Sequence, residues 1–167
     1  MTSITKRTMT TAWIFAGLAT AAAAAAPDGH RPRCRAVRAD LVEDFATEGC
    51  KPPATQCFLG QVDGSRGLRG TTHFKSDSGA AGPRTSPGWI SYSGLFEYRT
   101  ARGTIFTRET GVVNTTEGQP ESGALTAFQK IVEGTGAYEG ATGHFFVSGF
   151  NINNHVVTKV TGTICRP

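Results

Sequence analysis

The stretch EGTGAYEGATGHFFVSG, residues 133–149, decides the fold, because five of its residues are glycine and three are large aromatics. A nucleotide-binding glycine motif needs a strand before the glycines and a helix after them, since the helix N-terminus holds the phosphate. Here the spacing is not GxGxxG, and the aromatic and β-branched residues of HFFVSGF favour a strand. The stretch therefore predicts a tight glycine turn at a barrel end, followed by a β-strand.

The rest of the chain beyond residue 26 alternates apolar and polar residues in short runs bounded by turn-forming residues, which is typical of a sandwich or barrel. We expect eight strands, at residues 36–45, 57–62, 68–75, 89–99, 104–112, 124–133, 142–150 and 156–164. An eight-stranded meander can close on itself, and closure places the first strand beside the last in antiparallel sense. The predicted fold class is all-β, a single eight-stranded antiparallel up-and-down barrel over residues 36–167, preceded by a signal peptide.

The first 26 residues have the pattern of a secretory signal peptide. Lys6 and Arg7 precede a mostly apolar run that ends in alanines, and its strongly apolar part, residues 12–18, is shorter than the ~20 residues of a membrane span. We expect cleavage among residues 23–26, an N-terminal arm over residues 27–35, and a secreted or periplasmic protein that has no membrane association in its mature form.

The charge of the mature chain argues against nucleic-acid binding. The leader removes Lys6 and Arg7 but no acidic residue from the 17 basic and 13 acidic residues of the chain, which leaves a formal net charge of +2. A nucleic-acid-binding domain would carry a basic stripe. The arginine-rich RPRCRAVR lies in the expected arm, where we interpret it as solvated, and we expect no nucleic-acid partner.

The four cysteines all lie beyond the leader, and an even number in an exported chain indicates two disulfides. They form no CxxC pair and the histidines are scattered, so we expect no metal site and no cofactor. Cys34 precedes the first expected strand and Cys165 follows the last, so barrel closure would bring them together. Cys50 and Cys57 flank the loop KPPATQ. Of the three connectivities, we favour Cys34 with Cys165 and Cys50 with Cys57.

The hairpin YSGLFEYRTARGTIFTRETG, residues 92–111, is where we expect the wall of a lumen. A two-residue turn at Arg102 and Gly103 would force Arg102 to positive φ, whereas a type I turn with Gly103 in the bulge position avoids this. The bulge register pairs Tyr98 with Phe106 and Phe96 with Arg108. The inward face, and with it the candidate ligand-binding set, is then Tyr92, Phe96, Tyr98, Phe106 and Arg108. The outward face is then Glu97, Arg99, Thr107 and Glu109.

Two charged residues of this hairpin could take part in chemistry. Arg108 could receive a carboxylate or stack on a ring, although an arginine at the rim or paired within the protein is the favoured interpretation. In the two-residue register, Arg108 pairs with Glu97 outside, and Glu109 joins the lumen candidates beside Phe96. A buried Glu109 would have a raised pKa and could act as an acid or base. No GxSxG nucleophile is present, and we assign no catalytic residue.

Four segments carry a resemblance to a known family: ADLVEDFATEGCKPPATQCFLGQVDGSRGLRG, GLFEYRTARGTIFTRETGVVN, IVEGTGAYEGATGHFFVSG and the terminal VTGTIC. They resemble secreted bacterial proteins with an allene oxide cyclase barrel, a fold similar to plant dirigent proteins. The resemblance implies an eight-stranded barrel, a trimeric homo-oligomer as in many plant members, and a lumen for a small apolar molecule. It also implies that a reactive intermediate is steered without a cofactor, but none of the family's catalytic residues is carried over here.

Three functions follow as expectations. The first is a secreted β-barrel that works without a cofactor and binds a small apolar or amphipathic molecule in its lumen. The second is an isomerase or cyclase of the allene oxide cyclase kind. The third is an inert, disulfide-stapled structural protein whose barrel is filled by its own side chains.

Overall fold

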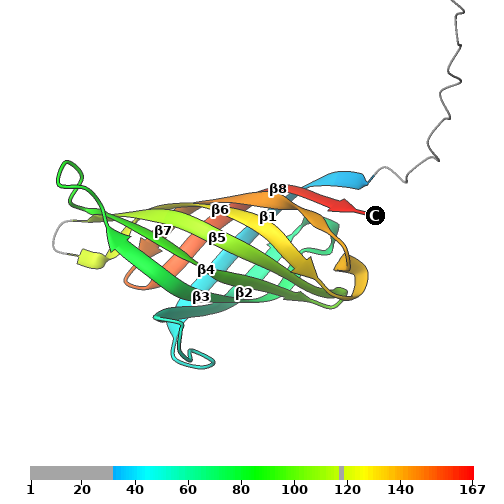
Figure 1. The fold of residues 1–167 in the computed structure, drawn as a ribbon, viewed down its shortest axis with the longest axis horizontal. Helices are drawn as coiled ribbons and strands as arrows, with labels where there is room; N and C mark the ends of the chain where they lie inside the picture. The colour runs from blue at the N-terminus through cyan, green and yellow to red at the C-terminus, as the bar shows by residue number, and fades with distance from the viewer. Residues whose placement is uncertain (1–31, 117–118) are drawn as a thin grey trace, which may run out of the picture.

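The computed structural model describes residues 32–116 and 119–167, so the expected signal peptide and residues 27–31 of the expected arm lie outside the described residues. The described chain forms a closed barrel in which eight antiparallel strands follow one another in chain order (Figure 1). This confirms the predicted fold class. The strands are β1 (Arg33–Ala46), β2 (Gln56–Gly64), β3 (Arg69–Ala81), β4 (Trp89–Thr100), β5 (Gly103–Thr116), β6 (Gln119–Gly134), β7 (Thr142–Ile152) and β8 (His155–Arg166).

Several strands extend beyond their predicted bounds. β1 begins at Arg33, within the stretch expected to be an arm, and β3 and β5 run on into segments expected to be loops. Residues 78–81 of β3 are exposed without interruption. Because this part of the strand buries neither face, the sequence carries no alternating pattern there. Backbone pairing alone continues the strand beyond the barrel wall.

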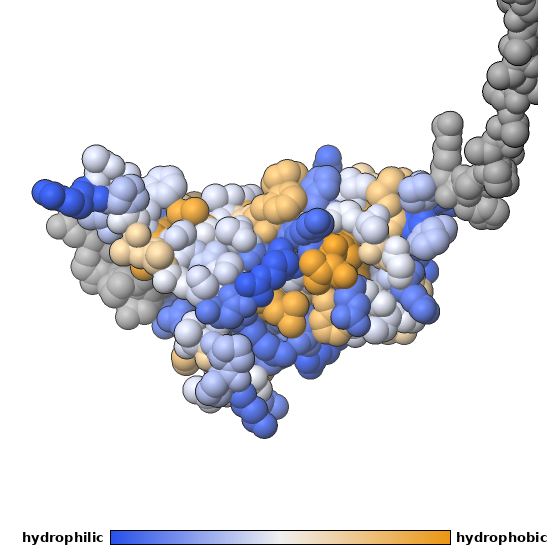
Figure 2. Space-filling view, in the orientation of Figure 1, coloured by the Kyte–Doolittle hydropathy of each residue, from blue (hydrophilic) through white to orange (hydrophobic). Residues whose placement is uncertain are grey.

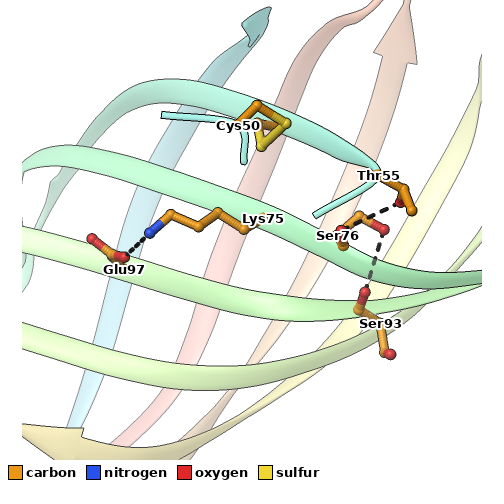
Figure 3. The surroundings of a disulfide bond; sticks show 7 residues. Cys50, Thr55, Lys75, Ser76, Ser93 and Glu97 are labelled. Carbon is orange, nitrogen blue, oxygen red and sulfur yellow. Dashed lines mark hydrogen bonds and ion pairs between the residues drawn. A yellow bond between two sulfur atoms is a disulfide. The ribbon is translucent and has the colours of Figure 1, made fainter. Parts of the chain in front are cut away.

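The seam between β1 and β8 closes the barrel. These strands pair from Arg33 opposite Arg166 to Asp44 opposite His155. Cys34 lies opposite Cys165 and forms a disulfide with it, and a second disulfide joins Cys50 to Cys57. The predicted connectivity is therefore confirmed. Figure 3 shows the second bridge at β2, beside Lys75 of the neighbouring strand β3.

The glycine-rich stretch forms the turn that was predicted from it. β6 ends at Gly134, a 3-10 turn labelled η2 spans Gly136–Tyr138, and β7 begins at Thr142. Gly136 has a φ of +59°, which favours glycine. A Cβ at Gly134 would lie 2.0 Å from the carbonyl oxygen of Tyr138. The turn thereby carries Tyr138, which is 0% exposed, across the end of the barrel.

Large side chains fill the interior at this end, which we call the closed end. Its centre is occupied by Leu68, Tyr98, Ile105, Tyr138 and Phe145, each 0% exposed. The Tyr138 hydroxyl donates a hydrogen bond to the Gly67 carbonyl oxygen at 3.0 Å, and the Arg166 guanidinium lies 4.8 Å from the centroid of the Tyr138 ring. The first and last strands start and finish here (Figure 1).

The outer surface carries apolar residues among polar ones. Phe128 and Phe146 lie opposite each other on β6 and β7 with ring centroids 5.4 Å apart, and both are exposed. On the face shown in Figure 2, apolar residues form separate groups among hydrophilic ones. No helix within residues 32–116 and 119–167 has the length and apolar character needed to cross a bilayer.

Candidate functional site

The end of the barrel opposite Tyr138, which we call the mouth, contains a cavity of about 290 Å³. Its aromatic lining consists of Phe58, Phe74, Tyr92 and Phe96, and its aliphatic lining consists of Leu41, Ile90, Val113, Leu125, Val147 and Val156. These residues come from all eight strands, and each occupies an inward position of its strand. The cavity is therefore an unfilled part of the barrel interior.

Two glycines allow aromatic rings to lie against the barrel wall. A Cβ at Gly94 would lie 2.5 Å from the Phe74 ring, and a Cβ at Gly111 would lie 2.4 Å from the Tyr92 ring. Because these inward positions carry no side chain, the rings rest on the backbone of β4 and β5. The space on the barrel axis at the mouth is thus left open, while the rings form its walls.

The register of the β4–β5 hairpin differs from both registers considered from the sequence. Thr100 pairs with Gly103, so the turn residues are Ala101 and Arg102. The Arg102 amide donates to Thr100 Oγ1 at 3.0 Å, and the Thr100 hydroxyl donates to the Gly103 carbonyl oxygen at 2.9 Å. Gly103 takes the positive φ of +132° as the first residue of β5. The predicted bulge register was wrong because these two hydrogen bonds stabilise a shorter turn.

This register decides which candidate residues face the lumen. Tyr92 and Phe96 line the cavity, Tyr98 lies beneath it in the filled interior, and Glu109 faces inward. Thr107, which was expected to face outward, also faces inward and is 0% exposed. Phe106 lies opposite Glu97 on the outer face, where Arg108 is exposed. Phe106 and Arg108 therefore do not belong to the lumen wall.

The outward charged residues are paired with one another. The Arg108 guanidinium donates two hydrogen bonds to the Asp77 carboxylate, at 2.5 and 2.9 Å. Glu97 forms ion pairs with Lys75 and Arg99, each at 2.5 Å, and not the pair with Arg108 that the alternative two-residue register would give. Figure 3 shows the Lys75–Glu97 pair between β3 and β4, near the Cys50 bridge. These contacts stabilise the outer face and leave the guanidinium of Arg108 far from a ligand in the cavity.

Glu109 is held by a chain of hydrogen bonds across three strands. The Tyr92 hydroxyl on β4 donates to Glu109 Oε1 at 2.9 Å, and Gln129 Nε2 on β6 donates to Glu109 Oε2 at 2.5 Å. The Tyr98 hydroxyl in turn donates to Gln129 Oε1 at 2.6 Å. Glu109 is 4% exposed and Gln129 is 0% exposed. The carboxyl group is thus fixed in one orientation at the wall of the cavity.

A second carboxyl group, that of Glu43 on β1, lies in the same cavity wall. It is 5% exposed and accepts a hydrogen bond from the Thr72 hydroxyl at 3.0 Å. Burial raises the pKa of Glu109 to about 7, although the hydrogen bonds from Gln129 and Tyr92 act in the opposite direction. Burial, together with the negative charge of Glu109, raises the pKa of Glu43 well above its ordinary value. None of the described residues that line the cavity is basic.

The sequence interpretation missed Glu43, although the sequence contains a signal for it. Val37, Ala39 and Leu41 alternate with exposed residues along β1, and Glu43 occupies the next inward position. Every second residue of β1 from Val37 onward points inward, and continuing this alternation past Leu41 would have placed the Glu43 carboxylate in the interior. Gln129 carries a similar signal, because it lies in the inward phase of β6 between Ala127 and Ile131. The partners of Gln129 and Thr72 could not be predicted in this way, since only the barrel register brings them close.

Two further polar groups line the cavity. Thr158 is 3% exposed, and its Oγ1 has no hydrogen-bond partner within the described part of the chain; the same holds for the buried Oδ1 of Asn151. An unpartnered buried polar atom is unfavourable and calls for an explanation. Both atoms are enclosed by the surrounding protein, and no described group supplies a partner for them.

Comparison with family models finds no match to this chain, and comparisons with curated proteins and with solved structures find no significant match either. Among the described residues, no three His, Cys, Asp or Glu side chains are arranged to hold a metal ion. The class of protein is therefore defined by the structure itself: a disulfide-bonded, eight-stranded β-barrel that is filled at one end and contains an apolar cavity with two buried carboxyl groups at the other.

Proposed function

We propose that this barrel binds a small, largely apolar molecule in the cavity at its mouth. The observation that carries the proposal is the contrast within one interior: side chains fill the closed end, whereas a volume of about 290 Å³ is left open between aromatic and aliphatic walls at the mouth. Ligand pockets occupy about 300–1,000 Å³, with apolar walls and a few polar groups. This cavity lies at the lower limit of that range and has the same composition.

The proposed setting is an exported protein. Two disulfides fit an oxidising compartment, which agrees with the signal peptide expected from the sequence. The closed eight-stranded barrel agrees with the resemblance to allene oxide cyclase and dirigent-like proteins, and that resemblance supports a small-molecule ligand and a homo-oligomer. An inert barrel filled by its own side chains would have no use for an open cavity of this size.

The experiment is to fill the cavity and follow the binding of a neutral probe. Val113 lies between Ile90 and Leu125 in the cavity wall, whereas Val112 faces outward on the same strand. We expect 3-phenylpropan-1-ol to bind to the native protein in ligand-observed NMR and to lose binding in Val113→Phe. Val112→Phe is the matched control and should bind as the native protein does. Absence of binding to the native protein, or equal binding by both variants, would contradict the proposal.

A second candidate function is acid–base catalysis of an isomerisation or cyclisation. It is favoured by Glu109, whose carboxyl lies in the cavity wall with a pKa of about 7, close to the value that suits a general acid or base at neutral pH. A labile epoxide should then rearrange faster with the protein than in buffer, and Glu109→Gln should abolish the difference. Glu139→Gln, which changes an exposed glutamate, is the control. Equal rates with and without the native protein would remove this candidate.

A further inference from the structure

We propose that the ligand of the mouth cavity carries a protonated amine on a small apolar body, and that the carboxyl groups of Glu43 and Glu109 receive this amine. The inference rests on the proposed function, because it names the chemical class of the molecule that the cavity binds. It is carried by the hydrogen-bonding state of the cavity wall and by its charge.

Three hydroxyl groups of the cavity wall, those of Tyr92, Thr115 and Ser76, are already used within the protein. The Tyr92 hydroxyl donates to Glu109, the Thr115 hydroxyl donates to the Gly88 carbonyl oxygen at 2.8 Å, and the Ser76 hydroxyl lies 3.3 Å from the Ser93 carbonyl oxygen (Figure 3). A ligand could use these three hydroxyl groups as donors only by breaking their bonds, which leaves side-chain amides such as those of Gln56 and Asn154 as other donors in the lining.

The acceptors of the wall, in contrast, have capacity left. A carboxylate offers about four acceptor positions, whereas Glu109 receives two hydrogen bonds and Glu43 receives one within the described structure. The wall therefore suits a ligand that brings several N–H donors, as an ammonium group does.

The charge of the wall selects a cation among such donors. Two buried carboxyl groups share this wall, and no arginine, lysine or histidine is among the described residues that line it. A ligand cation would favour their ionised forms, whereas a ligand carboxylate would add a third like charge. The rings of Phe74, Tyr92 and Phe96 present aromatic surface to the same space, and aromatic faces attract ammonium groups.

The binding should depend on pH in a defined direction. The titratable groups that face Glu109 are Glu43 from β1 and Tyr92 and Tyr98 from β4, and no basic group faces it from β3, β6 or β8 within the described residues. Glu109 gains a proton as the pH falls through about 7 and then loses its charge. Amine affinity should therefore be high at pH 8 and decrease at pH 5.5, although the amine itself stays protonated throughout.

The experiment compares three molecules with the same phenylpropyl body: 3-phenylpropylamine, 3-phenylpropan-1-ol and 3-phenylpropionate, titrated by NMR at pH 8 and pH 5.5. At pH 8 we expect the amine to bind about tenfold more tightly than the alcohol, which corresponds to about 1.4 kcal/mol, and the carboxylate to bind most weakly. At pH 5.5 we expect the preference for the amine to fall severalfold. Glu109→Gln and Glu43→Gln should each reduce it at pH 8, and Glu139→Gln should leave it unchanged.

The outcomes separate this inference from the function on which it rests. If the alcohol binds to the native protein as tightly as the amine at pH 8, the inference is wrong and the proposed binding function stands. If none of the three binds, or if Val113→Phe leaves all affinities unchanged, both are wrong. A preference for the amine that persists in both glutamine variants, each shown to be folded by its thermal unfolding transition, would also overturn the role of the carboxyl groups.

Discussion

The two ends of the barrel are built from the same eight strands, yet one end is filled and the other is hollow. At the closed end, the chain crosses the opening through η2, and Tyr138 belongs to the buried cluster that contains Tyr98 and Ile105. At the mouth, the β3–β4 hairpin runs outward (Figure 1), and no comparable side chain among the described residues covers the opening. Alternation along a strand therefore decides which residues point inward, whereas the turns decide whether the interior is closed.

The charges of the two ends are also opposite. A surface hollow of about 520 Å³ at the closed end is lined by five arginines, Arg33, Arg35, Arg66, Arg102 and Arg166. The carboxyl groups of Glu43 and Glu109 lie instead in the wall of the mouth cavity. Of the three buried polar atoms that have no hydrogen-bond partner in the described chain, those of Asn151 and Thr158 lie at the mouth, whereas Nε2 of His73 does not line the cavity. The ionisable side chains that line the hollow at the closed end are therefore basic, whereas those that line the mouth cavity are acidic.

The largest expected effect is the loss of the seam disulfide at the closed end. The Cys34–Cys165 bridge joins residues 131 apart in sequence, and the Cys50–Cys57 bridge joins residues 7 apart. In the chain-entropy account, replacing both seam cysteines by alanine costs about 5 kcal/mol of unfolding free energy, against about 2.5 kcal/mol for the short loop. Urea denaturation of the two double variants measures this difference. Equal losses would show that the seam does not depend on its bridge.

Removal of the Tyr138 ring should have the next largest effect. Tyr138→Ala leaves a void under η2, and truncation of a buried aromatic costs about 3–5 kcal/mol. Tyr138→Phe retains the ring and loses only the hydrogen bond to the Gly67 carbonyl oxygen, so it should cost about 1 kcal/mol. Both values follow from urea denaturation. If the alanine variant is no less stable than the phenylalanine variant, Tyr138 does not close this end.

The carboxyl group of Glu109 should make the protein less stable as the pH rises. Its folded pKa of about 7 lies above the ordinary 4.5, so the native state holds a proton that the unfolded state has released between these values. The stability contribution of this group is therefore largest below pH 4.5 and is lost up to pH 7, by about 3 kcal/mol in total.

Glu109→Gln tests this dependence, because it keeps the shape of the side chain and removes the titration. The variant should gain stability over the native protein at pH 8 and differ little from it at pH 4. Thermal unfolding of both proteins across this pH range measures the difference. Contributions from titrating groups that do not interact with Glu109 cancel in the comparison, whereas that of Glu43 does not, because the charge of Glu109 raises the pKa of Glu43. A constant difference between the two curves would mean that Glu109 is not buried as described.

The smallest expected effect comes from adding volume at the mouth. Val113→Phe places a larger ring in an open cavity and should change the unfolding free energy by less than about 1 kcal/mol, whereas Ile105→Phe overpacks the filled end and should cost about 1–3 kcal/mol. Ile105 is 0% exposed, which explains the difference. Equal costs at the two positions would mean that the mouth is as densely packed as the closed end.

The sequence was sufficient to predict the barrel and its disulfides. The glycine turn before HFFVSGF, the short alternating runs, and the cysteines flanking the first and last strands all constrain the same topology. It was not sufficient for the lumen hairpin, because a shift of one residue in register turns every side chain to the other face. The two hydrogen bonds of Thr100 decide between the possible registers of this hairpin. In the observed register Glu109 faces inward and Phe106 and Arg108 face outward, which is the reverse of the register favoured from the sequence.

The closed end also holds the C-terminal residue of the chain, next to the start of β1 (Figure 1). A molecule joined to Pro167 would project from the side of the barrel away from its opening. Protein tethered to a sensor surface through this residue would thus present its mouth cavity to the flowing solution, which suits a direct test of small-ligand binding.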